Sequence, residues 1–218
     1  AKFSKGATLD PLAQFITSRH SDKEAYSDRN IEEDKISELS NHVAIIADQQ
    51  RVHALRQITW DALEIEMLTP RTLKESVDLM RIGKREINAN PDGIEMREPM
   101  LDALYNVGLL NRKMLLDTDH SGFRAKMNAM QRTCFATPAF AVMTTPGNTR
   151  HDQIDAGRDW MRYSLTVTSL GLGTHPMSQA LQEYPEVSTQ YDQVHQMLAK
   201  DGETVQMLAR VGYGSNAI

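Results

Sequence analysis

The apolar run Pro138-Ala139-Phe140-Ala141-Val142-Met143-Thr144-Thr145 is followed at once by the turn residues Pro146-Gly147-Asn148. A short apolar run that ends in a turn signal predicts a buried strand. Two further segments have strand character. Val43–Ala47 is continuously apolar and rich in β-branched residues, and in Val205–Gly212 apolar residues alternate with others.

Helical patterns surround these strands. Asp10 followed by Pro11 predicts a short helix to Phe15, and Asp48 predicts the cap of a long helix to Glu66. The remaining predicted helices cover residues 69–88, 99–116, 153–170 and 190–199. Long helices with three separated strands predict an α+β domain, although three strands make a thin sheet for this much helix.

Length and composition limit the classes of protein that this chain can belong to. Its 218 residues, 40% apolar and 24% charged, suit one globular domain. A net charge of -5 argues against a nucleic-acid binder, and no apolar run is long enough to span a membrane. The lone Cys134 excludes an internal disulfide framework, and the histidines lack a metal-ligand spacing. We therefore expect no metal, and we expect Cys134 to be a buried small hydrophobe.

The segment Arg19-His20-Ser21-Asp22-Lys23 follows the first predicted helix and concentrates hydrogen-bond donors. Arginine offers a planar fork, lysine a point charge and serine a short donor, a set that suits a phosphate group. The alternative is an ordinary solvated turn, because Asp22 and Glu24 dilute the positive field.

A second candidate segment, Gly171-Leu172-Gly173-Thr174, follows the helix predicted to end at residue 170. Glycines let a backbone approach a flat ring closely and point N–H groups at an acceptor. The alternative is a glycine helix cap. The segment follows a helix rather than a strand and lacks the GxGxxG spacing, so it does not indicate a Rossmann site.

Taken together, the two segments resemble a known family. Residues 16–31, which contain Arg19-His20-Ser21-x-Lys23, are similar to the opening of nitroreductase-like flavoproteins, and Gly171–Thr174 is similar to their Gly-Leu-Gly segment. The closest resemblance is to the C-terminal half of Acg-like FMN-binding oxidoreductases. It is carried by residues 75–84, 90–94, 156–162, 175–186 and 210–214 and extends over residues 12–214.

This resemblance implies a nitroreductase-like α+β fold with a central, mainly antiparallel sheet flanked by helices. It implies FMN as the cofactor, and it assigns Arg19, His20, Ser21 and Lys23 to the phosphate and ribityl chain. The backbone of Gly171, Leu172, Gly173 and Thr174 would lie near the pyrimidine and N5 edge of the flavin. No separate catalytic side chain is implied, because the flavin itself carries the hydride.

The sequence departs from the family pattern at one place. Nitroreductase-like proteins carry a segment resembling Asn-x-Gln-Pro-Trp before the first strand, whereas here Ile31–Asn41 runs almost directly into the strand. Because that segment contacts FMN across a dimer interface, we expect residues 1–218 to form one domain that is half of a duplicated or dimeric unit. Its partner would be a second copy or an N-terminal half.

The expected function is reduction of an unidentified small acceptor, such as a nitro compound or a quinone, by a bound flavin that NAD(P)H or another donor reduces. One alternative is an FMN-binding or flavin-sequestering protein with little turnover, and another is a structural half that only covers its partner. This chain alone indicates the cytoplasm, whereas relatives that carry a twin-arginine signal indicate the periplasm. The compartment therefore stays open.

Overall fold

The computed structural model describes residue 6 and residues 8–214, and the chain divides into two compact units. Unit 1 comprises Ala1–Ala62 and Arg132–Ile218, and unit 2 comprises Leu63–Gln131. The division points fall inside two helices, α2 (Gln49–Leu68) and α7 (Ser121–Phe135), so both helices supply residues to each unit.

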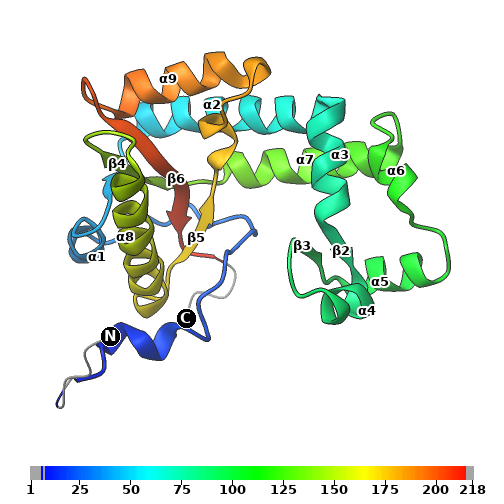
Figure 1. Ribbon diagram of the computed structural model, residues 1–218, viewed down its shortest axis with the longest axis horizontal. Coiled ribbons are helices and arrows are strands. Elements are labelled where there is room, and N and C mark those ends of the chain that lie inside the picture. Colours follow the sequence, from blue (N-terminus) through cyan, green and yellow to red (C-terminus); the bar gives the residue numbers. More distant parts are fainter. Residues whose placement is uncertain (1–5, 7, 215–218) are drawn as a thin grey trace. The chain divides into compact units, whose positions relative to one another are not determined.

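Unit 1 is built on a four-stranded antiparallel sheet with the strand order β1-β4-β6-β5 (Figure 1). The strands are β1 (Ala44–Ile46), β4 (Ala139–Thr145), β5 (Gly173–Pro176) and β6 (Thr204–Gly212). The three predicted strands are confirmed. The fourth, β5, was not predicted because its sequence, Gly-Thr-His-Pro, is short and contains two residues that are rare in strand interiors. Its presence corrects the expectation of a thin sheet.

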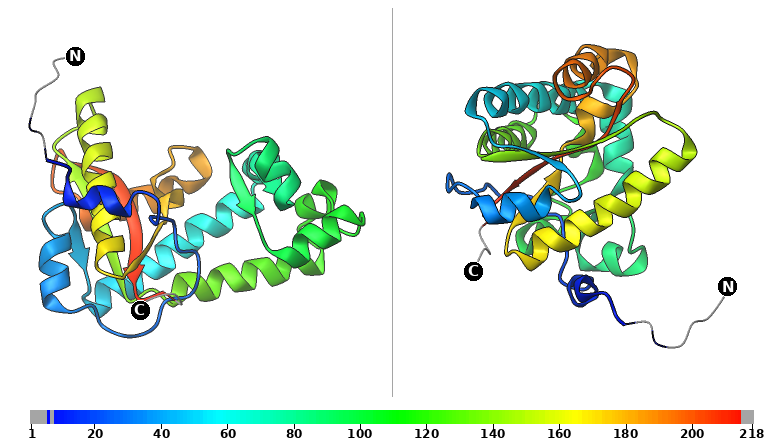
Figure 2. Two further views of the ribbon diagram at one scale, coloured as in Figure 1. Left: turned by 90° about the horizontal axis from the view of Figure 1, so that it is seen from below. Right: turned by 90° about the vertical axis from the view of Figure 1, so that its left-hand side faces the viewer.

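Helices pack on both faces of this sheet. The helices that lie wholly in unit 1 are η1 (Pro11–Phe15), α1 (Glu33–Leu39), α8 (Arg150–Ser169), η2 (Ser178–Leu181), η3 (Pro185–Val187) and α9 (Ser188–Leu198). Figures 1 and 2 show α8 on one side of the sheet and α9 on the other. The arrangement confirms the predicted α+β fold with helices around a central antiparallel sheet.

The core of unit 1 follows from strand alternation. Odd-numbered residues of the central strands, such as Ala141 and Val211, pack with Tyr163 and Val167 of α8. Even-numbered residues point to the opposite face, and among them Phe140, Leu208 and Arg210 are fully buried. A buried arginine among apolar neighbours needs polar partners.

Unit 2 contains a small parallel sheet that the sequence pattern did not reveal. Its elements are α3 (Pro70–Leu79), β2 (Met80–Ile82), α4 (Gly83–Ala89), β3 (Ile94–Met96), α5 (Pro99–Asn106) and α6 (Arg112–Leu116). The predicted helix over 69–88 is wrong at its centre, where β2 pairs with β3. The predicted helix over 99–116 is also wrong, because Gly108 adopts a φ of +77° and Asn111 caps a new helix. The helix α7 was not predicted.

A glycine holds the turn before β3. Gly93 has a φ of +75°, and a Cβ there would lie 2.2 Å from the carbonyl oxygen of Leu79. We expect Gly93→Ala to destabilise the protein by roughly 2–3 kcal/mol, since left-handed strain and a backbone clash act together. Gly108→Ala is the matched control, because its φ is similar but no atom lies within 4 Å. If urea unfolding shows that both variants lose the same free energy of unfolding, the predicted clash with the Leu79 carbonyl is wrong.

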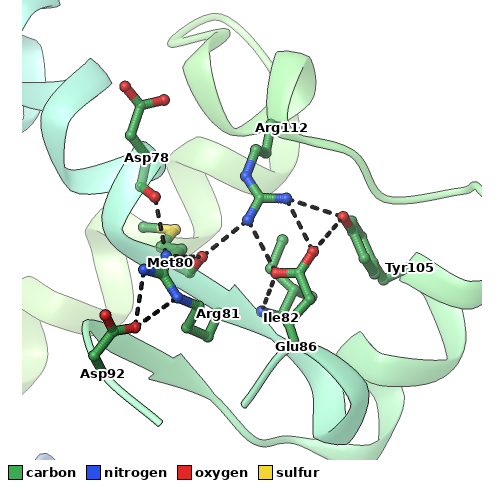
Figure 3. A network of polar contacts seen from close by, with 8 residues as sticks. All are labelled: Asp78, Met80, Arg81, Ile82, Glu86, Asp92, Tyr105 and Arg112. Carbon is green, nitrogen blue, oxygen red and sulfur yellow. Dashed lines mark hydrogen bonds and ion pairs between the residues drawn. The ribbon is translucent and has the colours of Figure 1, made fainter. Parts of the chain in front are cut away.

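A polar network joins β2 to the helices that follow it (Figure 3). The Glu86 carboxylate accepts from both terminal nitrogens of Arg112, at 3.2 and 2.9 Å, from the Tyr105 hydroxyl at 2.8 Å and from the Ile82 N–H at 2.9 Å. Arg112 also donates to the Met80 carbonyl. Hydrogen bonds from Arg112, and then from Ile82 and Tyr105, lower the pKa of Glu86 from 4.5 to about 2. The network stabilises unit 2.

The depressed pKa predicts how Glu86 supports unit 2 as the pH changes. Its contribution is complete above pH 4.5 and is lost as the pH falls toward about 2, because protonation removes the hydrogen-bonded anion. We expect Glu86→Gln to cost about 1 kcal/mol at neutral pH, given partial solvent screening, and less at pH 3. Urea unfolding followed by circular dichroism checks this, with Asp78→Asn as an exposed control. If Glu86→Gln lowers the free energy of unfolding by the same amount at pH 7 and at pH 3, this prediction is wrong.

Candidate functional site

The Arg19–Lys23 segment lies in the connection between η1 and α1 and runs beside the outer edge of β5. The backbone N–H of Asp22 donates to the carbonyl of Thr174 at 3.0 Å. Thr174 belongs to the glycine segment, so the structure brings the two candidate segments into direct contact. Asp22, which was not among the predicted site residues, is buried at this junction.

The cations of this segment are open to an incoming anion. His20, Ser21 and Lys23 are exposed and Arg19 is half-buried. Within the part of the chain that the structure describes, neither Arg19 nor Lys23 has a carboxylate within ion-pair distance. His20 uses Nδ1 to donate to the Ser18 carbonyl at 3.0 Å. Two cations without a carboxylate partner favour a phosphate site over a turn that neutralises itself.

The buried Arg210 of β6 attaches this segment to the sheet. Its guanidinium extends across β5, where Nε donates to Nδ1 of His175 at 3.1 Å. Beyond β5, Nη2 donates to the carbonyls of Asp22 at 2.9 Å and Glu24 at 2.7 Å. These two carbonyls lie on either side of Lys23, so Arg210 fixes the backbone that carries this lysine.

Backbone carbonyl dipoles and the aromatic ring of Tyr26 stabilise the charge of Arg210. Nη1 donates to the carbonyl of Thr133, 3.3 Å away in the last turn of α7, where a helix carries partial negative charge. The guanidinium lies 4.2 Å from the ring centre of Tyr26, whose hydroxyl donates to the Asp22 carbonyl. Burial lowers the pKa of Arg210 below its ordinary value. The residue is therefore an internal anchor rather than a surface cation.

The glycine segment has mainly structural contacts. Gly171, at a φ of +68°, ends α8, which confirms the helix-cap alternative for this residue. Gly173 leaves room for Asp22, because a Cβ there would lie 2.7 Å from the Asp22 carboxylate. Leu172 is buried in the core. The Thr174 hydroxyl is held between Tyr163 and the Arg210 carbonyl. A ligand at this segment would thus meet its backbone rather than the Leu172 and Thr174 side chains.

Comparison with known proteins supports the fold. No protein-family model and no curated protein matches this chain. The FMN-dependent nitroreductase NfnB of Mycobacterium smegmatis, solved in complex with NADPH, is 18% identical with a TM-score of 0.54, over 94% of this chain and 88% of that one. A nitroreductase with bound FMN from Desulfitobacterium hafniense DCB-2 is 13% identical with a TM-score of 0.51, over 95% and 91%. This chain has the nitroreductase fold.

Within this nitroreductase fold, sequence reasoning missed the residues that hold the site together. The signal for Arg210 was a charged residue inside an otherwise apolar strand pattern. Tyr213 is a second anchor, since its hydroxyl donates to Glu32 and accepts from Lys35 at 2.9 Å. Hydrogen bonding by Tyr213 is the main cause that lowers the pKa of Glu32 to about 2. These bonds join the end of β6 to α1.

The residues that the structure describes do not support a metal site, a membrane-spanning helix or a reactive cysteine. They contain no group of three histidine, cysteine or acidic side chains that could hold a metal ion, and no helix apolar and long enough to cross a membrane. Cys134 is buried, and burial raises the pKa of its thiol to about 11, so the thiol is protonated at neutral pH. This confirms the prediction of a buried small hydrophobe.

Proposed function

We propose that this chain is an FMN-dependent oxidoreductase of the nitroreductase-like superfamily. NAD(P)H would supply the electrons, and a nitro compound or quinone would accept them. One observation carries the proposal: the cationic segment and the glycine segment meet at the edge of β5, through the Asp22–Thr174 hydrogen bond, within a nitroreductase fold.

The donor set fits the phosphate end of FMN. Arg19 and Lys23 supply two cations that have no carboxylate partner among the described residues, and His20 and Ser21 add exposed polar groups beside them. A phosphate prefers several converging donors, at least one of them a planar guanidinium. We assign Arg19, His20, Ser21 and Lys23 to the phosphate and ribityl chain.

The glycine segment fits the flavin end. A Cβ at Gly171 would meet no atom within 4 Å, so the backbone there is open to a flat ring. We place the pyrimidine and N5 edge against the backbone of Gly171, Leu172, Gly173 and Thr174. FMN, when bound, supplies hydride-transfer chemistry, while the backbone of these residues would bind and orient it.

We further propose that a second protein surface completes the site. Residues 33–39 form α1, directly before β1, and the sequence between Lys23 and β1 contains no segment resembling Asn-x-Gln-Pro-Trp. A second copy of this chain, or the other half of an Acg-like pair, would supply that side of the flavin.

The direct test is a flavin assay on the purified chain, paired with its oligomeric state. We expect a yellow protein that releases FMN on denaturation and oxidises NADPH in the presence of a nitroaromatic compound or a quinone. A colourless chain that takes up no added FMN would refute the proposal. Bound FMN without NAD(P)H oxidation would instead favour the flavin-sequestering alternative.

A further inference from the structure

We propose that His175 is an additional donor of the phosphate site and that Arg210 is the residue that positions it. Arg210 holds the imidazole so that Nε2–H, beside Lys23, donates to a phosphate oxygen. This inference rests on the proposed function, because the phosphate in question is that of FMN.

The first step is the tautomer of His175. Arginine carries only hydrogen-bond donors, so Nδ1 of His175 must accept the 3.1 Å hydrogen bond from Arg210 Nε. The ring proton therefore lies on Nε2. His175 and Arg210 are also direct partners in the β5–β6 register, which places both side chains on the same face of the sheet.

The second step is that Nε2 is still available. Nε2 makes no hydrogen bond to any residue in the described part of the chain. It is not a buried atom without a partner, so it can still reach solvent. An N–H that is fixed in direction and still reaches solvent costs little to use when a ligand arrives, because its orientation is already set.

The third step places His175 near the cationic segment. Asp22 is hydrogen-bonded to Thr174, the residue before His175, and Lys23 follows Asp22 directly. Burial, then the charges of Arg210 and Lys23, lower the pKa of His175 to about 3. The imidazole is therefore neutral at physiological pH, and it contributes an oriented N–H rather than a third cation.

Binding of two flavins that differ only in the phosphate tests the assignment. His175→Asn keeps an oxygen that can accept from Arg210 but removes the donor at the Nε2 position, whereas His175→Gln returns an amide N–H to about that distance. We expect His175→Asn to weaken FMN binding about tenfold or more, as for a lost hydrogen bond to a charged group, and to leave riboflavin binding unchanged. We expect His175→Gln to recover part of the loss.

The measurements are flavin fluorescence titrations of the full chain and the ¹⁵N shifts of His175 at neutral pH. If His175→Asn weakens FMN and riboflavin binding equally, His175 has only a structural role and the proposal is overturned. Unchanged FMN affinity in this variant would also overturn it, and so would ¹⁵N shifts that show the proton on Nδ1 of His175. A wild-type chain that binds no FMN would refute the proposed function and this inference together, so the wild-type titration separates the two failures.

Discussion

Replacing Arg210 by methionine is expected to lower the free energy of unfolding by about 3–5 kcal/mol, the largest effect that we predict for a single substitution. Arg210 is fully buried, and its guanidinium donates to the carbonyls of Asp22, Glu24 and Thr133 and to His175. Methionine fills much of the volume but leaves buried acceptors without their donor. Urea unfolding followed by the fluorescence of Trp60 and Trp160, both in unit 1, measures the loss.

Arg162→Met is the control for this prediction. Arg162 lies on α8 with half of its side chain exposed and pairs with Asp10 at 2.8 Å. Its loss should cost less than about 1 kcal/mol, as for other exposed pairs. If both arginine variants unfold at the same urea concentration, the anchoring role of Arg210 is wrong.

The double variant Arg19→Ala/Lys23→Ala is expected to weaken FMN binding about 100-fold or more, because two charge-assisted contacts to the phosphate are lost together. The fold should be preserved, since neither side chain has a carboxylate partner among the described residues and the segment is attached through the backbone of Asp22 and Glu24. Flavin content after dialysis and a fluorescence titration measure the effect.

Arg158→Ala/Lys200→Ala is the matched control, since it removes two exposed cations elsewhere on unit 1 and changes the net charge equally. If this control weakens FMN binding as much, the effect reflects overall charge. If flavin retention is unchanged in the Arg19/Lys23 variant, the phosphate lies elsewhere.

The elements that could be predicted from sequence are those whose signals are local. The run Ala139–Thr145 is apolar and ends at a proline-glycine turn, and α8 ends at a glycine, so both were found. The candidate segments were also local, since each lies within a few consecutive residues. That they touch could be expected only from the family resemblance.

What could not be predicted depends on pairing between distant residues. Met80–Ile82 continues a helical pattern, and it becomes a strand because Ile94–Met96 lies alongside it. Gly173–Pro176 becomes a strand because β6 and Asp22 offer hydrogen bonds on its two sides. In the same way, the role of Arg210 is set by carbonyls far away in the chain.

The span of that anchor has a consequence for how the molecule is made. Arg210 and Asp22 are 188 positions apart, and β6 is synthesised after the other strands that the structure describes. Closing so long a loop is slow compared with forming local helices. During translation, the cationic segment leaves the ribosome before β6 does, and it receives its anchor only after β6 has followed. Binding of the proposed cofactor would therefore report that β6 has joined the sheet of unit 1.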